Sequence, residues 1–177
     1  MTDLAVYWWK EVSGGELAQG DLFPNCRIPV LSLKPNTSAE APLEQGSVTA
    51  DFIVVTQTCD LANNRAQFVA LCPIYSLSKF EIVNPEYSRK GKWEGVRKGR
   101  VEALHLLASP QYPKDNRQAH VADFGHIVSV PVEYLARHAE AVGTRWRLQS
   151  PFLEHFSQSF ARFFMRVGLP ADIPPFK

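Results

Sequence analysis

A cysteine and an aspartate follow directly after the most apolar stretch of the chain. The segment FIVVTQT at 52–58 begins with aromatic and β-branched residues, which is typical of a strand buried on both faces, and Cys59 and Asp60 come next. A thiolate at such a strand end is a nucleophile when a histidine lies close to it. The structural alternative is a buried cysteine and an aspartate that caps a turn.

Two histidines and an aspartate later in the chain could bind a metal ion. His120, Asp123 and His126 could converge in a turn but not in a straight strand, where Asp123 would point away from both histidines. Such a site therefore needs a bulge or turn at Gly125. The alternative is a pair of hydrogen-bonded core histidines. We predict no resident metal or other cofactor, and these three residues are the candidate ligands if a metal is bound.

A cluster of positive charge that contains one tryptophan lies in the middle of the chain. The run RKGKWEGVRKGR at 89–100 holds six basic residues and one acidic residue. Basic side chains neutralise phosphates and an aromatic ring can stack on a base, so this segment favours single-stranded nucleic acid as a ligand. A solvated loop is the alternative, because three glycines weaken any helix there. The candidate contact residues are Arg89, Lys90, Lys92, Trp93, Arg97, Lys98 and Arg100.

Composition and missing motifs exclude several classes of protein. The 177 residues are 45% hydrophobic and carry a net charge of +1, which predicts a single folded domain over 1–177 and no overall attraction to polyanions. Three cysteines without a CxxC pair argue against a disulfide framework or a zinc ribbon. No apolar stretch is long enough for a membrane span and no signal peptide is recognisable, so we expect a cytoplasmic protein without membrane contact. No Gly-rich phosphate loop, GxSxG or HExxH motif occurs.

Hydrophobic patterning predicts the elements that would position these residues. A turn at 19–23 is expected to enter a first strand that continues at 28–33. Further strands are expected at 52–58, 67–74, 101–108 and 120–130, and either a helix or a strand at 4–12. The strands at 52–58 and 67–74 should pair as a hairpin, because the connection of about eight residues is too short for a parallel crossover. Residues 34–50 are polar and indicate a long loop.

The expected fold class is α+β, with a small, strongly bent antiparallel β-barrel. The barrel core covers about 20–130, and an insertion at 75–100 carries one or two short helices. Two amphipathic helices at about 131–168 close the chain. The second of them has a broad phenylalanine stripe, so we expect it to be buried and to contribute strongly to the core.

Three motifs follow one another between Gly20 and Ile74. They are GDLF at 20–23, DFIVVTQTCDLANN at 51–64 and QFVALCPI at 67–74. This order resembles the core of the MazF/PemK-like toxin family, in which a Gly-Asp turn enters the first strand and a later strand runs into a Pro-Ile dipeptide. The resemblance implies an SH3-like barrel, metal-independent cleavage of single-stranded RNA, and a homodimer.

The two catalytic residues of that family have no direct counterpart. The family places an Arg before the β-branched strand and a Thr after the Pro-Ile dipeptide, as a cation for the transition state and a hydroxyl near the attacking oxygen. Here these positions fall at Ala50-Asp51 and at Tyr75. A nearby arginine and serine could replace them. The candidate catalytic set is therefore Cys59, Asp60, Arg65 and Ser76.

The leading hypothesis is a MazF/PemK-like protein that binds or cleaves single-stranded RNA in a toxin-antitoxin or defence setting, with an antitoxin or larger protein as partner. The second hypothesis is a non-catalytic protein-interaction module or a subunit of a larger complex, which the missing Arg and Thr favour. The third is a Cys59-dependent enzyme.

Overall fold

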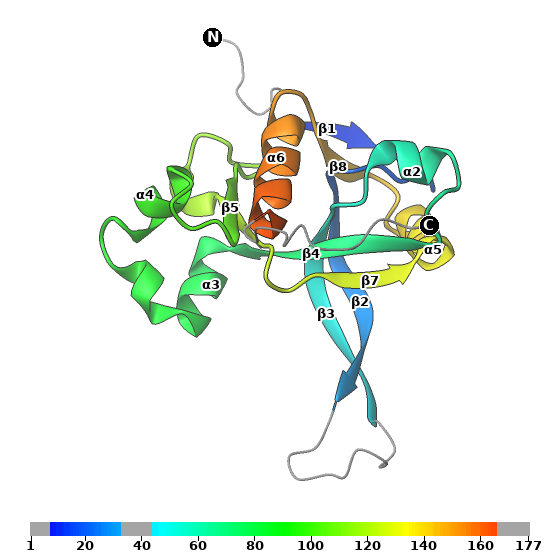
Figure 1. Cartoon of the computed structure of the whole chain (residues 1–177), viewed down its shortest axis with the longest axis horizontal. Coiled ribbons are helices and arrows are strands. Elements are labelled where there is room, and N and C mark those ends of the chain that lie inside the picture. Colours follow the sequence, from blue (N-terminus) through cyan, green and yellow to red (C-terminus); the bar gives the residue numbers. More distant parts are fainter. Residues whose placement is uncertain (1–7, 33–43, 166–177) are drawn as a thin grey trace, which may run out of the picture.

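The chain combines an antiparallel sheet with short helices (Figure 1), which confirms the predicted α+β class. The computed structural model describes residues 8–32 and 44–165. The strands are β1 Trp9–Val12, β2 Asp21–Ser32, β3 Glu44–Val54, β4 Phe68–Ser76, β5 Leu104–Leu107, β6 His120–Asp123, β7 Val128–Pro131 and β8 Arg145–Leu148. The helices are α2 Thr58–Ala62, α3 Leu77–Val83, α4 Lys92–Arg97, α5 Val132–Val142 and α6 Phe152–Phe164, with 3-10 turns η1 Pro85–Ser88 and η2 Asn116–Gln118.

Strand β4 is the centre of the sheet. Within the described ranges the strand order is β1-β8-β2-β3-β4-β6-β5, and every pair is antiparallel. Strand β3 pairs with one edge of β4, while β7 and β6 share the other edge. No ladder joins β1 to β5 among these residues, so the sheet is open. Its two ends nevertheless approach, because the Trp9 indole donates a hydrogen bond of 2.9 Å to the Ala108 carbonyl, directly after β5.

The predicted hairpin is confirmed, since residues 51–54 of β3 pair antiparallel with 71–74 of β4. Several predicted boundaries are wrong. Helix α2 begins at Thr58, where a strand was expected, and β3 begins at Glu44, inside the expected loop. The expected strand at 120–130 is two strands, because the Gly125 N–H donates to Oδ1 of Asp123 at 2.9 Å and closes a turn between them.

Other elements match the predictions in part. The insertion holds α3, η1 and α4, as expected. Strand β1 occupies part of the N-terminal segment 4–12, whose pattern fits either a helix or a strand. Residues 1–7, 33–43 and 166–177 lie outside the described residues. Strand β8 was not predicted at all. None of the described helices is long and apolar enough to cross a bilayer.

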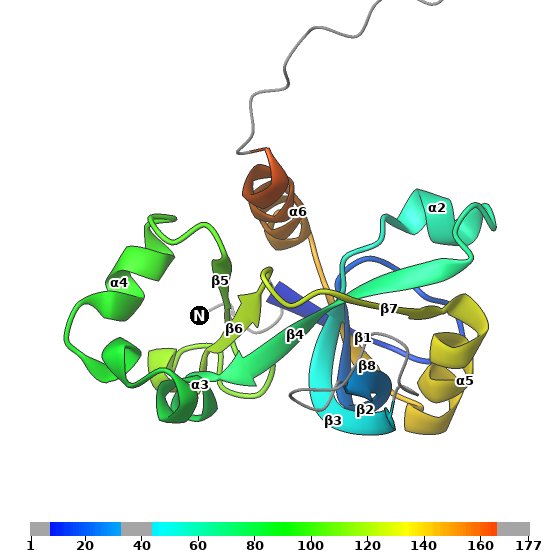
Figure 2. The ribbon, with the colours of Figure 1, turned by 60° about the horizontal axis from the view of Figure 1, so that its bottom comes forward.

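Helices cover both sides of the sheet (Figure 2). In the described residues, α5 packs Leu135 and Ala139 into one apolar cluster, and α4 contributes Val96 to another. Helix α6 covers a third cluster with Phe156, which is fully buried. The prediction that the whole phenylalanine stripe is buried is wrong. Only one face of α6 meets the sheet, and Phe164 near its end is 59% exposed.

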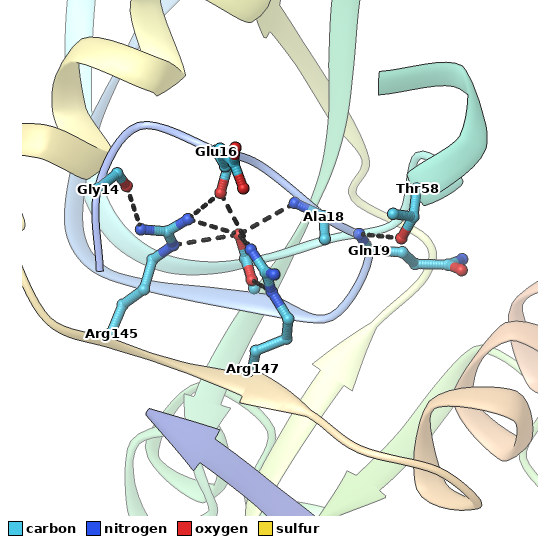
Figure 3. A network of polar contacts seen from close by, with 8 residues as sticks. Gly14, Glu16, Ala18, Gln19, Thr58, Arg145 and Arg147 are labelled. Carbon is cyan, nitrogen blue, oxygen red and sulfur yellow. Dashed lines mark hydrogen bonds and ion pairs between the residues drawn. The ribbon is translucent and has the colours of Figure 1, made fainter. Parts of the chain in front are cut away.

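A buried carboxylate with two arginines joins the start of β2 to β8 (Figure 3). Asp21 is fully buried, and Arg145 donates to its Oδ2 from Nε at 3.1 Å and from Nη2 at 3.0 Å. Arg147 donates to both carboxylate oxygens. The same guanidinium groups bond the carbonyls of Gly14 and Glu16. Strand β8 therefore holds the loop before β2 through charge-assisted hydrogen bonds shielded from water.

The same loop fixes the exit of β3. The Gln19 backbone N–H donates to Oγ1 of Thr58 at 3.1 Å, and its side-chain amide donates to the Val55 carbonyl at 3.0 Å. Gly20 has a φ of +83°, and a Cβ there would lie 2.9 Å from the Cβ of Leu148. Glycine is therefore required at this turn. The turn places Gln19 so that its N–H bonds Thr58, the first residue of α2.

We expect Asp21→Asn to lower the free energy of unfolding by about 3–5 kcal/mol, because it leaves the Arg145 guanidinium buried without its charge partner. Chemical denaturation at neutral pH measures this loss. The matched control is Glu94→Gln, which removes a carboxylate from an exposed ion pair and should leave stability nearly unchanged. Equal effects of the two substitutions would contradict the role assigned to Asp21.

Candidate functional site

The cysteine and aspartate predicted as catalytic lie on helix α2, and Cys59 is exposed. The Cys59 sulfur lies 3.6 Å from Oε1 of Gln57 and 3.9 Å from Oδ1 of Asp60. Catalytic cysteines are activated by a histidine or another cation, and neither of these two contacts supplies one. Arg65 follows the helix, and its backbone N–H bonds the Asp60 carbonyl at 2.9 Å. These contacts do not support nucleophilic catalysis by Cys59.

The fourth predicted catalytic residue lies far from the other three. Ser76 ends β4 and caps helix α3, where its hydroxyl accepts the Lys79 N–H at 3.3 Å. Helix α2 precedes the other end of β4, and nine residues of strand span about 25 Å at the usual rise. Figure 1 shows α2 and α3 at opposite ends of this strand. The structure does not bring Ser76 together with Cys59, Asp60 and Arg65.

The tryptophan of the basic segment is engaged within the fold. Trp93 packs against Phe80 and Tyr87, with ring centroids 5.7 Å and 5.1 Å apart. Its indole N–H donates to Oε1 of Glu81 at 2.8 Å. The ring is therefore half-buried in this apolar cluster and held by a hydrogen bond.

Two of the basic residues neutralise an acidic neighbour. Arg97 donates to both Glu94 oxygens, at 2.6 and 2.7 Å, and the Lys98 ammonium lies 3.2 Å from the same carboxylate. Hydrogen bonds from Arg97 and then from Lys98 lower the pKa of Glu94 from 4.5 to about 2. The other basic residues of the segment are exposed, namely Arg89, Lys90, Lys92 and Arg100.

The three candidate metal ligands do not converge. The His126 Nδ1 lies 2.8 Å from Oδ2 of Asp123, in the turn after β6. His120 lies at the other end of β6, where it pairs with Ser76 and Leu107. Over residues 8–32 and 44–165, no group of three or more metal-ligating side chains is close enough to hold an ion.

His120 has an unpaired polar atom in the interior. Its Nδ1 is buried and has no hydrogen-bond partner among the described residues. The strand register sets Ser76 opposite His120, and Asp51 opposite Ile74. Directly opposed residues share a face of the sheet, and so do alternate residues of one strand. Asp51, Ser76 and His120 therefore face the same side.

The charges around His120 suit a proton acceptor. Burial lowers the pKa of His120 below its ordinary value of 6.5, while the Asp51 carboxylate raises it and the Lys79 ammonium lowers it. The imidazole is therefore neutral at neutral pH and can take up a proton. Asp51 accepts the backbone N–H of Asn25 at 2.8 Å, from the bulge in β2. We call Asp51, Ser76, Lys79 and His120 the His120 cluster.

A separate recess lies over strand β5, between helices α4 and α6. Its volume is about 800 Å³, within the usual range of about 300–1,000 Å³ for ligand pockets. Three acidic residues in its walls balance two arginines, so the recess is not a basic channel. We call it the β5 groove. Its charged and aromatic lining includes Trp8, Trp93, Glu94, Arg97, Glu102, His105, Asp115, Phe152, His155 and Arg162.

One histidine in the floor of this groove is strongly perturbed. Burial, and then the charge of His155, lower the pKa of His105 from 6.5 to about 4. Its ring lies against Phe124 and Phe156, with centroids 6.1 Å and 5.7 Å away. His105 is therefore a neutral ring that supports the packing of α6 on the sheet.

The sequence reasoning missed Asp51, Lys79 and His105 and gave His120 a metal role. The Asp51 position was noted only as the place of a missing arginine, and the strand register that joins it to His120 has no local sequence signal. A scan against protein-family models finds no match to the chain, and a search of curated proteins finds none either.

We expect acid to destabilise the protein partly through His105. The pKa of His105 is lower in the folded than in the unfolded protein. The stability that the neutral ring contributes is therefore fully present above about pH 6.5 and is lost as the pH drops toward 4. At about 1.4 kcal/mol per pKa unit, the wild-type protein should lose about 2 kcal/mol more unfolding free energy between pH 7 and 4.5 than His105→Gln does. Denaturation curves at both pH values measure the difference. His126→Gln, at an exposed position, should retain the full wild-type loss, and an identical loss in His105→Gln would contradict this role.

Proposed function

We propose that the protein is a MazF/PemK-like RNA-binding protein that cleaves single-stranded RNA without metal, in a toxin or defence setting, with the His120 cluster as its active site. The observation that carries this proposal is the buried, unpaired Nδ1 of His120 on the same face as Ser76 and Asp51. These residues stand at or beside the positions where the resemblance places the family's two catalytic residues. We infer that His120 acts as the general base at this place, where the family's arginine and threonine are missing.

The chemistry needs a base, a cation and a hydrogen-bond donor near one phosphate. His120 takes the proton from the 2′-hydroxyl as the 2′-oxygen attacks the adjacent phosphorus. The bond from phosphorus to the 5′-oxygen breaks, and the 5′-oxygen takes up a proton from water. The products are a 2′,3′-cyclic phosphate and a 5′-hydroxyl. The Lys79 ammonium and the Ser76 hydroxyl stabilise the charge on the phosphate oxygens. Asp51 favours the imidazolium that His120 becomes.

The distribution of charge supports an anionic ligand on this part of the molecule. Residues 77–119 contain nine lysines and arginines and five acidic residues, whereas the whole chain has a net charge of only +1. This segment joins Ser76 to His120 along the chain, so the excess of positive charge is carried by residues that lie between two members of the His120 cluster in sequence. Such a field attracts RNA and makes its affinity fall as salt rises.

The approach of the two end strands of the sheet is consistent with an SH3-like barrel, which is part of the same proposal. The long β2–β3 hairpin and central β4 carry the matched motifs. The contact between Trp9 and Ala108 draws the two end strands together. A strongly bent antiparallel sheet is the frame that we expect for the family's fold.

The decisive assay incubates the protein with a long single-stranded RNA in EDTA and reads the products on a denaturing gel. We expect discrete fragments with cyclic phosphate ends, and His120→Gln should lower the cleavage rate at least 100-fold. Cleavage should also weaken in acid, at a pH below the ordinary histidine pKa of 6.5, because a protonated His120 cannot act as a base and burial lowers its pKa. His126→Gln is the matched control and should cleave at the wild-type rate. Intact RNA with the wild-type protein, or equal activity in both variants, would contradict the proposal.

A non-catalytic interaction module is the second candidate function. The observation that favours it is the engagement of the basic segment, in which Arg97 and Lys98 neutralise Glu94 and Trp93 is half-buried. The test is filter binding of RNA at about 100 mM salt, with the wild-type protein and with a variant that lacks the charges of Arg89, Lys90 and Arg100. If RNA stays intact and removing these charges does not weaken its binding, this second function replaces the first.

A further inference from the structure

Strand β5 is an end strand of the sheet, and one of its edges has no strand beside it in the described part of the chain. It pairs only with β6, in the register Leu104 to Asp123 through Leu107 to His120. An edge strand presents backbone N–H and C=O groups that another extended segment can bond. In this protein, such an edge lies in the β5 groove rather than on an open surface.

The register shows which backbone groups face the groove. The Phe124 N–H donates to the Ala103 carbonyl at 2.8 Å, which makes these two residues a hydrogen-bonded pair. Hydrogen-bonded pairs alternate along an antiparallel ladder, so His105 and Leu107 bond β6. The N–H and C=O of Leu106 therefore point away from β6, toward the groove.

Two helices enclose this edge from opposite sides. Leu104 belongs to the apolar cluster that contains Val96 of α4, and Leu107 to the cluster that contains Phe156 of α6. Residues three apart on a strand point to opposite faces, so α4 and α6 cover opposite faces and leave the edge between them. Figure 2 shows β5 between the two helices. The carbonyl of Ala108, at the end of the edge, already accepts the hydrogen bond from the Trp9 indole. The open stretch is therefore limited to β5 itself.

We propose that this groove docks an extended segment of a second protein, which adds as a strand to the edge of β5 between α4 and α6. The four-residue strand offers a pairing length of about 13 Å, enough for four or five residues of a partner. The balanced charges of the walls fit a peptide of mixed character better than a polyanion. This inference is independent of the proposed RNA chemistry, whose site is the His120 cluster.

The chain's own C-terminal segment is a poor occupant. It follows α6 closely, but Pro170, Pro174 and Pro175 lack the N–H that a paired strand must donate. Residues 1–7 directly precede Trp8, which lines the groove, and a second copy could offer its own β5. Deletion of residues 1–7 and sedimentation velocity distinguish the N-terminal segment and a second copy from a partner peptide.

The test selects binders from a displayed library of random twelve-residue peptides on the full chain, and then follows single backbone amides by NMR hydrogen exchange. In the free protein the Leu106 amide should exchange faster than those of His105 and Leu107. A selected peptide should slow Leu106 exchange at least tenfold. Leu106→Pro removes the outward N–H and should therefore weaken binding at least tenfold. The variant should still fold, because proline is tolerated in an edge strand where the N–H faces outward. Leu106→Ala keeps the N–H and should bind nearly as well, and His120→Gln should bind like wild type.

Several results would overturn the proposal. They are a selection without binders, binders that leave Leu106 exchange unchanged, and equal binding by the proline and alanine variants. Slow Leu106 exchange in the free chain would do so too. If that protection disappears when residues 1–7 are deleted, the occupant is the chain's own N-terminus. If it appears only with dimers in sedimentation velocity, the occupant is a second copy.

Discussion

The ion cluster of Asp21 with Arg145 and Arg147 is the interaction on which the geometry of the sheet depends. It places one desolvated carboxylate between two guanidinium groups from β8, 124 and 126 residues away in sequence. Removing charges from water costs several kcal/mol each, so the cluster is stable only while all its hydrogen bonds are made. It ties β8 to β2 and, through Gln19, holds the point where β3 leaves the sheet. A short strand with two arginines thereby becomes part of the interior.

The sheet that results separates two regions of different chemistry. Near the junction of β4 and β6, a half-buried histidine faces a carboxylate and lies close to an ammonium group. Along the free edge of β5, apolar walls with balanced charges surround backbone groups that face outward. The first arrangement suits proton transfer, and the second suits pairing with an extended chain. The insertion at 75–100 contributes to both, because α3 begins beside the histidine and α4 forms a wall of the groove.

Local patterns predicted the elements whose stability is local. The β3–β4 hairpin has β-branched residues and a short connection, and α5 has an apolar face and a terminal glycine, so both were foreseen. Strand β8 was not, because its sequence RWRL alternates charge with apolar residues and Arg145 is buried only through a distant carboxylate. The predicted catalytic residues are not all brought together, for the same reason. Cys59 and Ser76 looked close in sequence, but β4 separates them, whereas His120 reaches Ser76 only through strand register.

The most direct measurement of the central claim is the NMR titration of the His120 imidazole, alone and with an RNA oligonucleotide carrying 2′-deoxy sugars that cannot be cleaved. We expect a pKa below the ordinary 6.5 in the free protein, because the half-buried ring is partly shielded from water. The pKa should rise when the oligonucleotide binds, since a phosphate beside the ring stabilises the imidazolium. An ordinary free pKa that does not change with the oligonucleotide would contradict the assignment of His120 to an RNA-cleaving site.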